Sequence, residues 1–154
     1  MDAATVHAIQ IAARIHDVGK VGIPAELLSK PSPLTAPEFE LVKGHVQAGY
    51  DIVSRIDFAW PVADMILQHH ERLDGSGYPS GLRGAEIGTG ARIIAVADVV
   101  EAMSSHRPYR AGLGIDAALA EVTAGRGVRF DADAVDACGR LFDDGAFAFD
   151  VDVP

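Results

Sequence analysis

The stretch ARIIAVADVVEAMSS at residues 91–105 decides the fold. It is strongly apolar, which predicts a buried helix. Asp98 interrupts its most apolar part, IIAVADVV at residues 93–100, where an apolar side chain would pack better. The stretch therefore predicts a core helix and, within it, a polar group that needs a buried partner.

Helical spacing recurs along the rest of the chain, and no segment alternates as a strand does. Thr35 and Glu38 have the spacing of a capping box ahead of a long helix. Glycines and prolines between residues 74 and 90 predict a long irregular segment. We therefore expect an all-α helical bundle with helices at residues 3–17, about 35–56, 61–71, 91–105, 115–124 and 131–142, and a short helix that opens at Pro24.

Apolar stripes place candidate ligands on the buried faces of the first two long helices. In helix 35–56 the stripe includes Leu41, Ala48 and Ile52, and His45 falls on it. The stripe of the first helix consists of Val6, Ile9, Ala12, Ala13 and His16.

Length and charge limit the classes of protein to which the chain can belong. With 154 residues it can bury one core, so we expect a single domain over residues 1–154. Its apolar runs fall short of the roughly 20 residues that cross a bilayer, and the opening MDAATVHAIQ lacks the features of a signal peptide. We expect a cytoplasmic protein without membrane contact. The formal charge of -9 argues against DNA as a partner.

Side chains that bind metals recur on the apolar faces of separate helices. Burying so many unpaired polar groups would cost a few kcal/mol each, so we expect them to satisfy one another through a metal. Taken singly, each has another explanation, such as a core histidine bonded to a carbonyl or an aspartate paired with an arginine. The residues are His16, Asp17, His45, His69, His70 and Asp98.

Imidazole and carboxylate ligands without thiolates suit iron, manganese or zinc and argue against a structural zinc knuckle. A carboxylate such as Asp17 can bridge two ions. Paired ions can activate a water and stabilise the leaving oxygen in phosphoester hydrolysis, which is the mechanism that we expect.

Two motifs resemble those of HD-GYP proteins, a type of HD-domain phosphohydrolase. The HDVGKVGIP segment at residues 16–24 is similar to the HD motif and its continuation, and HHERLDGSGYP at residues 69–79 is similar to the HHExxDGxGYP signature. The pair Ala97-Asp98 and the segment RPYR at residues 107–110 match as well. The resemblance extends from about residue 13 to residue 131.

The resemblance implies an HD-domain bundle with a long GYP loop, which hydrolyses cyclic di-GMP to the linear dinucleotide or to GMP. It implies that the six residues above are metal ligands and that Asp17 is a bridging, catalytic ligand. Lys20, Arg107 and Arg110 would hold phosphate, with Lys20 also catalytic, and Gly77 and Tyr78 would lie along the substrate. Arginine and lysine are natural partners of phosphate oxygens.

The resemblance also implies groups that this chain lacks. HD-GYP proteins have a further ligand on a helix upstream of the HD pair, so we expect two divalent ions, iron or manganese, and no third ion. We expect Glu71 to orient a ligated histidine. Upstream, the resemblance implies a receiver or sensor domain. Without the upstream helix, we expect exposed apolar surface that would favour a homodimer.

Two alternatives stay open from the sequence. One is an HD phosphohydrolase that acts on another nucleotide, such as a different cyclic dinucleotide. The other is a noncatalytic signalling module that binds a nucleotide or a partner protein through the GYP segment. The intact pairs His16-Asp17 and His69-His70 favour the enzyme.

Overall fold

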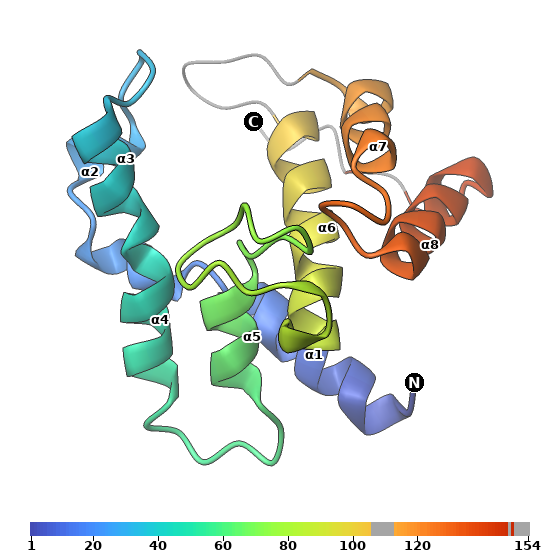
Figure 1. The fold of residues 1–154 in the computed structure, drawn as a ribbon, viewed down its shortest axis with the longest axis horizontal. Coiled ribbons are helices and arrows are strands. Elements are labelled where there is room, and N and C mark those ends of the chain that lie inside the picture. The colour runs from blue at the N-terminus through green and yellow to red at the C-terminus, as the bar shows by residue number, and fades with distance from the viewer. Residues whose placement is uncertain (106–112, 148, 150–154) are drawn as a thin grey trace.

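The computed structural model describes residues 1–105, 113–147 and 149, and these form a helical bundle (Figure 1). Within these ranges there is no strand, and the two β-bridges are isolated. The predicted all-α class is therefore confirmed. The elements are α1 (Ala3–Ile15), the 3-10 helix η1 (Val18–Gly22), α2 (Ala25–Leu28), α3 (Ala36–Lys43), α4 (His45–Val53), α5 (Val62–Gln68), the 3-10 helix η2 (Gly84–Glu86), α6 (Thr89–Ser104), α7 (Ile115–Ala124) and α8 (Ala132–Asp143).

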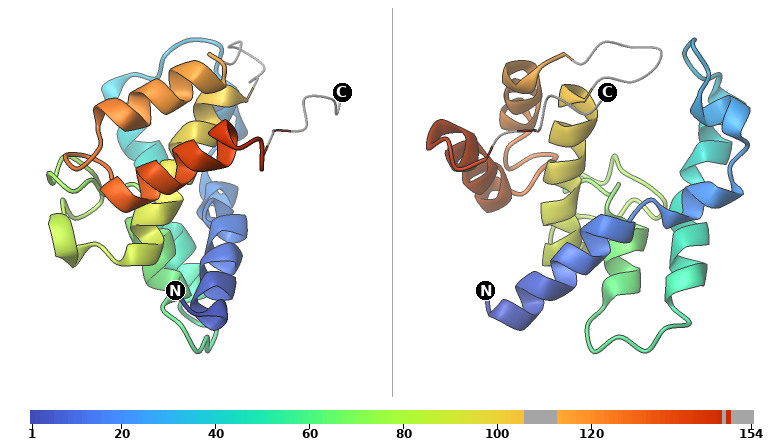
Figure 2. Two further views of the ribbon diagram at one scale, coloured as in Figure 1. Left: turned by 90° about the vertical axis from the view of Figure 1, so that its right-hand side faces the viewer. Right: turned by 180° about the vertical axis from the view of Figure 1, so that it is seen from behind.

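Helix α6 stands at the centre of the bundle and joins two hydrophobic clusters. In Figure 1 the helices α4 and α5 lie to its left and α7 and α8 to its right. The right-hand view of Figure 2, seen from behind, shows α1 crossing α6 on the side that faces away in Figure 1. Ile94 packs into the first cluster, with residues of α1, α4 and α5. Val96 and Val100 pack into the second cluster, with α7 and α8. The apolar stretch at residues 91–105 is thus the shared wall of both clusters, as its composition predicts.

Side chains cap the helices where the sequence indicates. Asp2 accepts a hydrogen bond from the backbone N–H of Thr5 at the start of α1. Thr35 and Glu38 form the predicted capping box of α3. Asp131 accepts hydrogen bonds from two backbone N–H groups of α8. Each cap satisfies donors that the first turn of a helix leaves without a partner.

The helix expected at residues 35–56 is divided into two helices, because it is interrupted at Gly44. The Gly44 N–H bonds to the carbonyl of Leu41, three residues back, which tightens the turn between α3 and α4. The break shifts the buried stripe, so that Leu41 is 51% and Ile52 43% exposed. The stripe predicted through these two residues is therefore wrong. The buried residues of α4 are His45, Val46, Gly49 and Val53.

Two smaller expectations also need correction. Val6 is exposed and Ala8 is buried in its place, because the buried face of α1 is rotated relative to the predicted stripe. The expected helix at 61–71 ends at Gln68, so that His69 follows the helix instead of lying within it. Helix α7 begins and ends where predicted, and no helix within the described ranges is long and apolar enough to span a membrane.

Candidate metal centre

Six side chains from four helices converge at one place. Each lies at the end of a helix or, for Asp98, in the middle of α6. Among the six, His45 and His69 are buried, with 1% and 0% of their surface exposed. The six are the predicted ligands His16 and Asp17 after α1, His45 at the start of α4, His69 and His70 after α5, and Asp98 of α6.

Three of the histidines are fixed by the same local hydrogen bond. The Nδ1 atom of each lies 2.6–2.8 Å from the carbonyl oxygen three residues earlier. These carbonyls lie in the last turns of α1, α3 and α5, where a helix leaves carbonyls without N–H partners. With Nδ1–H donating, Nε2 of the neutral imidazole carries the free lone pair. The pairs are His16 with Ala13, His45 with Val42, and His69 with Ile66.

The freed Nε2 atoms point to a shared interior space. Nε2 of His45 lies 3.5 Å from Oδ1 of Asp17, and Nε2 of His16 lies 3.5 Å from Oδ2 of the same carboxylate. Nε2 of His45, Nε2 of His69 and Oδ1 of Asp17 are buried without a hydrogen-bond partner. Leaving such atoms unpaired is costly, so this space is built for a group that accepts their lone pairs.

Asp98 closes the cluster from α6. Its Oδ1 lies 3.5 Å from Nε2 of His16, and its Oδ2 lies 3.9 Å from Nδ1 of His70. The rings of His69 and His70 are adjacent, with centroids 4.0 Å apart. Asp98 therefore contacts histidines from both motifs, and no arginine among the described residues forms an ion pair with it, which was its alternative explanation.

The electrostatics keep most of the imidazoles neutral. Burial lowers the pKa of His69 to about 4 and lowers the pKa values of His45 and His70 below their ordinary range. His16 differs, because its hydrogen bond with Asp98 raises its pKa. Burial opposes ionisation of Asp98, but the hydrogen bond from His16 and the nearby histidines lower its pKa further than burial raises it. Neutral imidazoles and ionised carboxylates are the forms that bind metal ions.

The donor set fits divalent metal ions. The ligand atoms fall into two groups, each within 4.8 Å: one of His45, His69 and His70, the other of His16, Asp17 and His69. Asp17 has one oxygen toward His45 and the other toward His16. Nitrogen and oxygen donors without thiolates suit iron, manganese or zinc.

Glycine at position 19 lets η1 approach α4 closely enough to bring Asp17 to His45. A Cβ atom at Gly19 would lie 2.0 Å from the His45 carbonyl oxygen and 2.5 Å from the Gly49 nitrogen. A side chain here would push the two elements apart. The glycine of the first motif thus serves the packing of the HD pair.

Lys20 lies at the edge of the cluster. Its Nζ is 2.5 Å from Oδ2 of Asp17, and 31% of its side chain is exposed. The cation is therefore beside the predicted bridging carboxylate and open to solvent, where a phosphate can reach it.

Glu71 does not orient a histidine, contrary to expectation. Its buried carboxylate accepts hydrogen bonds from the backbone N–H groups of Ser80 (2.7 Å) and Leu82 (3.0 Å). The neighbouring ligand His69 is oriented by the Ile66 carbonyl instead. Glu71 therefore fixes the segment that follows Tyr78.

Gly77 and Tyr78 lie next to the cluster. A Cβ atom at Gly77 would be 2.4 Å from the backbone of Glu71, so the loop crosses the second motif at close range. The ring of Tyr78 stacks on His70, with centroids 4.8 Å apart and planes inclined by 26°. Burial raises the pKa of the Tyr78 hydroxyl, which keeps it protonated. Arg107 and Arg110 lie outside the described residues.

The sequence did not indicate two residues that border this loop. Phe39 and Lys43 of α3 contact Tyr78, with 6.4 Å between the two ring centroids and 5.3 Å between Nζ and the Tyr78 centroid. Their i, i+4 spacing places them on one helix face, and this spacing is the feature of the sequence that relates the two residues. Nothing local links that face to a loop far along the chain.

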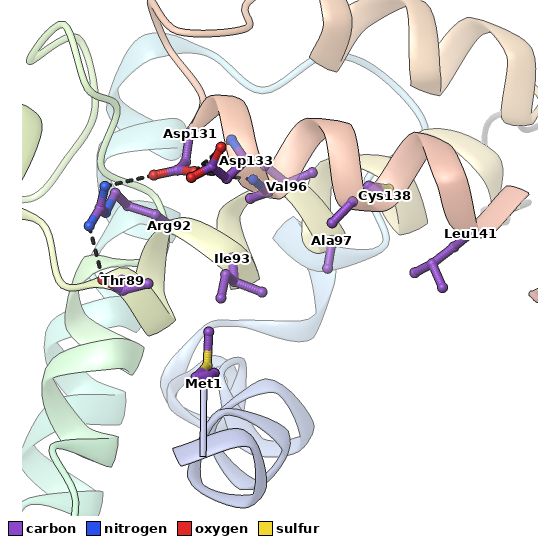
Figure 3. Close-up of a pocket in the computed structure, with 12 residues that line it drawn as sticks. Met1, Thr89, Arg92, Ile93, Val96, Ala97, Asp131, Asp133, Cys138 and Leu141 are labelled. Carbon is purple, nitrogen blue, oxygen red and sulfur yellow. Dashed lines mark hydrogen bonds and ion pairs between the residues drawn. The ribbon is translucent and has the colours of Figure 1, made fainter. Parts of the chain in front are cut away.

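A separate cavity of about 540 Å³ lies between the start of α1, α6 and α8 (Figure 3). Its walls include Ile93 and Ala97 of α6 and Cys138 of α8, and Arg92 and Asp131 form an ion pair of 2.6 Å at one end. None of the six candidate ligands lines it. The cavity is therefore distinct from the metal centre.

Comparison with known proteins identifies the family. The HD domain family matches residues 1–134. The chain is 48% identical over 137 residues to the cyclic di-GMP phosphodiesterase response regulator RpfG of Xanthomonas campestris, covering 88% of this chain and 36% of that protein. It is 43% identical over 145 residues to a cyclic di-GMP phosphodiesterase of Thermotoga maritima, covering 92% and 39%.

A third relative has a different substrate in its name. It is the 3'3'-cGAMP-specific phosphodiesterase 3 of Vibrio cholerae, 43% identical over 109 residues, with 71% of this chain and 24% of that protein covered. The chain thus spans less than half the length of each of these relatives.

Solved structures share the fold. An HDGYP-type protein of Bdellovibrio bacteriovorus, Bd1817, matches with a TM-score of 0.73 and 20% identity over 93% of this chain and 45% of that one. The cyclic GMP-AMP-specific phosphodiesterase V-cGAP3 of Vibrio cholerae matches with a TM-score of 0.67 and 20% identity over 98% and 42%. With these findings, the chain belongs to the HD domain family, and to the HD-GYP type that its two motifs resemble.

Proposed function

We propose that this chain is the core of a metal-dependent phosphodiesterase that hydrolyses cyclic di-GMP to the linear dinucleotide or to GMP. The observation that carries the proposal is the set of buried, unpaired ligand atoms: Nε2 of His45, Nε2 of His69 and Oδ1 of Asp17. Relatives named as cyclic di-GMP phosphodiesterases support the substrate, with 48% and 43% identity.

Two divalent ions, iron or manganese, fit the six candidate ligands of the cluster. The first ion would be held by His45, His69 and His70, and the second by His16 and Asp98, with Asp17 between them. When bound, paired ions supply Lewis-acid activation of water and of the phosphodiester.

The remaining groups bind and orient the substrate in this proposal. Asp17 is the catalytic carboxylate, since its two oxygens face the two ligand groups. Lys20, partly exposed beside it, is placed to bind a phosphate oxygen. Gly77 and Tyr78 form the loop along the substrate, and Arg107 and Arg110 are proposed to hold its second phosphate.

We propose that the chain acts within a longer protein that carries a receiver or sensor domain. A relative that it matches over 36% of the relative's length is named a response regulator, which supports an input domain. A homodimer and a cytoplasmic location stay predictions from the sequence.

The test is turnover of cyclic di-GMP by the manganese- or iron-loaded chain, followed by chromatography of the products. We expect linear dinucleotide or GMP from the wild type and a loss of roughly 100-fold or more in Asp17→Asn, which keeps the shape but not the charge. The matched control is Asp57→Asn, an exposed carboxylate on the α4–α5 loop, which should retain activity. Binding without turnover in metal-loaded protein would favour the noncatalytic module.

The name of one relative gives a specific reason to consider a second substrate. The relative named as 3'3'-cGAMP-specific is 43% identical to this chain, so a mixed cyclic dinucleotide is a candidate. The ratio of kcat/KM for cyclic di-GMP to that for 3'3'-cGAMP, measured on the same preparation, decides between them.

A further inference from the structure

An aromatic path leads from the metal centre to the surface. Tyr78 stacks on the candidate ligand His70 at 4.8 Å, and the edge of Phe39 meets Tyr78 at 6.4 Å with an angle of 80° between the planes. Phe39 comes from α3, which lies early in the chain and far from the GYP loop in sequence. With Tyr78 beside it, Phe39 still leaves 45% of its surface exposed.

Phe39 does not contribute to the hydrophobic core. It belongs to neither hydrophobic cluster, and α3 has no buried residue. A large exposed aromatic next to a binding site is more informative than a scattered surface residue, because aromatic faces are the surfaces on which nucleobases stack.

A cation accompanies the two rings. Nζ of Lys43 lies 4.8 Å from the Phe39 centroid and 5.3 Å from the Tyr78 centroid. It also pairs with Glu40 at 2.7 Å. Lys43 offers only hydrogen-bond donors, so a base with acceptors on its exposed edge suits it better than a base with an amino group there.

Helix α3 is held firmly enough to present these side chains. The Glu38 side chain completes the capping box. Its two carboxylate oxygens also accept hydrogen bonds from Nζ of Lys30, at 2.6 Å and 2.8 Å. The hydrogen bond from Lys30, together with those from Thr35, lowers the pKa of Glu38 to about 2, so this anchor stays ionised at neutral pH. The helix start is thus fixed one turn before Phe39 and two turns before Lys43.

We propose that Phe39 and Lys43 of α3, together with Tyr78, form a nucleobase subsite that favours guanine over adenine. Guanine presents the acceptors N7 and O6 on one edge, whereas adenine presents an acceptor and an amino donor there. One base of the substrate stacks against Phe39, and Lys43 donates to that acceptor edge. The subsite rests on the proposed phosphodiesterase function and names the residues that read the base.

The test uses binding, so that it does not depend on turnover. Isothermal titration calorimetry measures the dissociation constants of the hydrolysis-resistant bisphosphorothioates of cyclic di-GMP and cyclic di-AMP, with the metal-loaded full chain. The variants are Phe39→Ala, Lys43→Met and the control Leu41→Ala, which removes a 51% exposed side chain from the same helix. Circular dichroism checks that each variant is folded.

We expect Phe39→Ala to weaken binding of both analogues about tenfold, and Leu41→Ala to change it less than about twofold. Lys43→Met should weaken the guanine analogue about tenfold and narrow the preference over the adenine analogue. Unchanged constants in Phe39→Ala and Lys43→Met, or no binding by the wild type, overturn the subsite.

Turnover of cyclic di-GMP by the wild type is assayed separately. If the wild type turns over cyclic di-GMP but Phe39→Ala binds the analogues as tightly as the wild type does, the subsite is wrong and the phosphodiesterase proposal is retained. Phe39-dependent binding without turnover supports the subsite and overturns the phosphodiesterase. The two proposals therefore fail in different ways.

Discussion

His16, His45 and His69 obtain their orientation from the ends of their own helices. Each donates Nδ1–H to a carbonyl of a last helical turn and thereby turns Nε2 toward the metal centre. A histidine placed directly after or between helices thus satisfies an orphan carbonyl and fixes its own tautomer in one bond. This explains why these three histidines lie at helix ends and not within helices.

The pH dependence of the metal-free protein follows from the buried imidazoles. The folded state lowers the pKa of His69 to about 4 from an ordinary 6.5, so below pH 6.5 the unfolded chain takes up the proton first. Stability should therefore fall as the pH drops from about 6.5 to 4, by on the order of 3 kcal/mol for His69 alone. His45 and His70 act in the same direction, and His16, whose pKa is raised, opposes them.

Urea unfolding in the presence of a chelator at pH 7.5 and pH 5 measures this dependence. His69→Gln, which does not titrate, should show a smaller difference between the two pH values. A wild type that is equally stable at both, or more stable at pH 5, would contradict the assignment of neutral, buried imidazoles.

Glu71 makes a separate prediction about the loop. Glu71→Ala leaves the N–H groups of Ser80 and Leu82 without their buried acceptor, so we expect a loss of about 2–4 kcal/mol in the free energy of unfolding. The exposed Glu26 provides the control, since Glu26→Ala should change stability by less than about 0.5 kcal/mol. If Glu71→Ala were as stable as Glu26→Ala but lost metal, Glu71 would be an orienting group after all.

At the scale of elements, the contact between η1 and α4 decides whether Asp17 reaches His45. Gly19→Ala places a Cβ atom within 2.0 Å of a backbone oxygen of α4, so we expect a loss of about 3 kcal/mol or more and weaker metal binding. Gly22→Ala is the matched control, because it lies in the same 3-10 helix and its Cβ atom would meet nothing within 4 Å. Similar stability of the two variants, by thermal or urea unfolding, would show that the close approach is not required.

The helices themselves could be predicted where their signals are local. Helix α7 and the capping box of α3 follow from spacing and from capping residues nearby. The break at Gly44 could not be predicted, because one glycine inside a helical pattern is often tolerated. The break changes which helix face is buried, so that Leu41 and Ile52, which were expected in the core, are exposed.

At the scale of the whole molecule, α6 couples the metal centre to the second hydrophobic cluster. Asp98 faces the histidines, while Val96 and Val100 of the same helix pack against α7 and α8. The second motif is tied to the same region, since the N–H of Leu73 within it bonds to the Arg129 carbonyl at 3.1 Å. The position of the site thus depends on both halves of the bundle.

The candidate ligands could be predicted because their residue types conflict with the apolar patterns around them. Asp98 within IIAVADVV is the plainest example. Contacts between residues far apart in the sequence leave no such conflict in the local pattern. Phe39 looks like an ordinary residue of an amphipathic helix, and only the folded chain brings it to Tyr78.

The central claim is that the cluster binds two divalent ions, and the most direct test is the metal content per chain by elemental analysis. We expect two ions in the wild type and in His7→Ala, whose side chain is exposed, and at most one in His69→Ala, since His69 is a proposed ligand of the first ion. Equal metal content in wild type and His69→Ala would contradict the account.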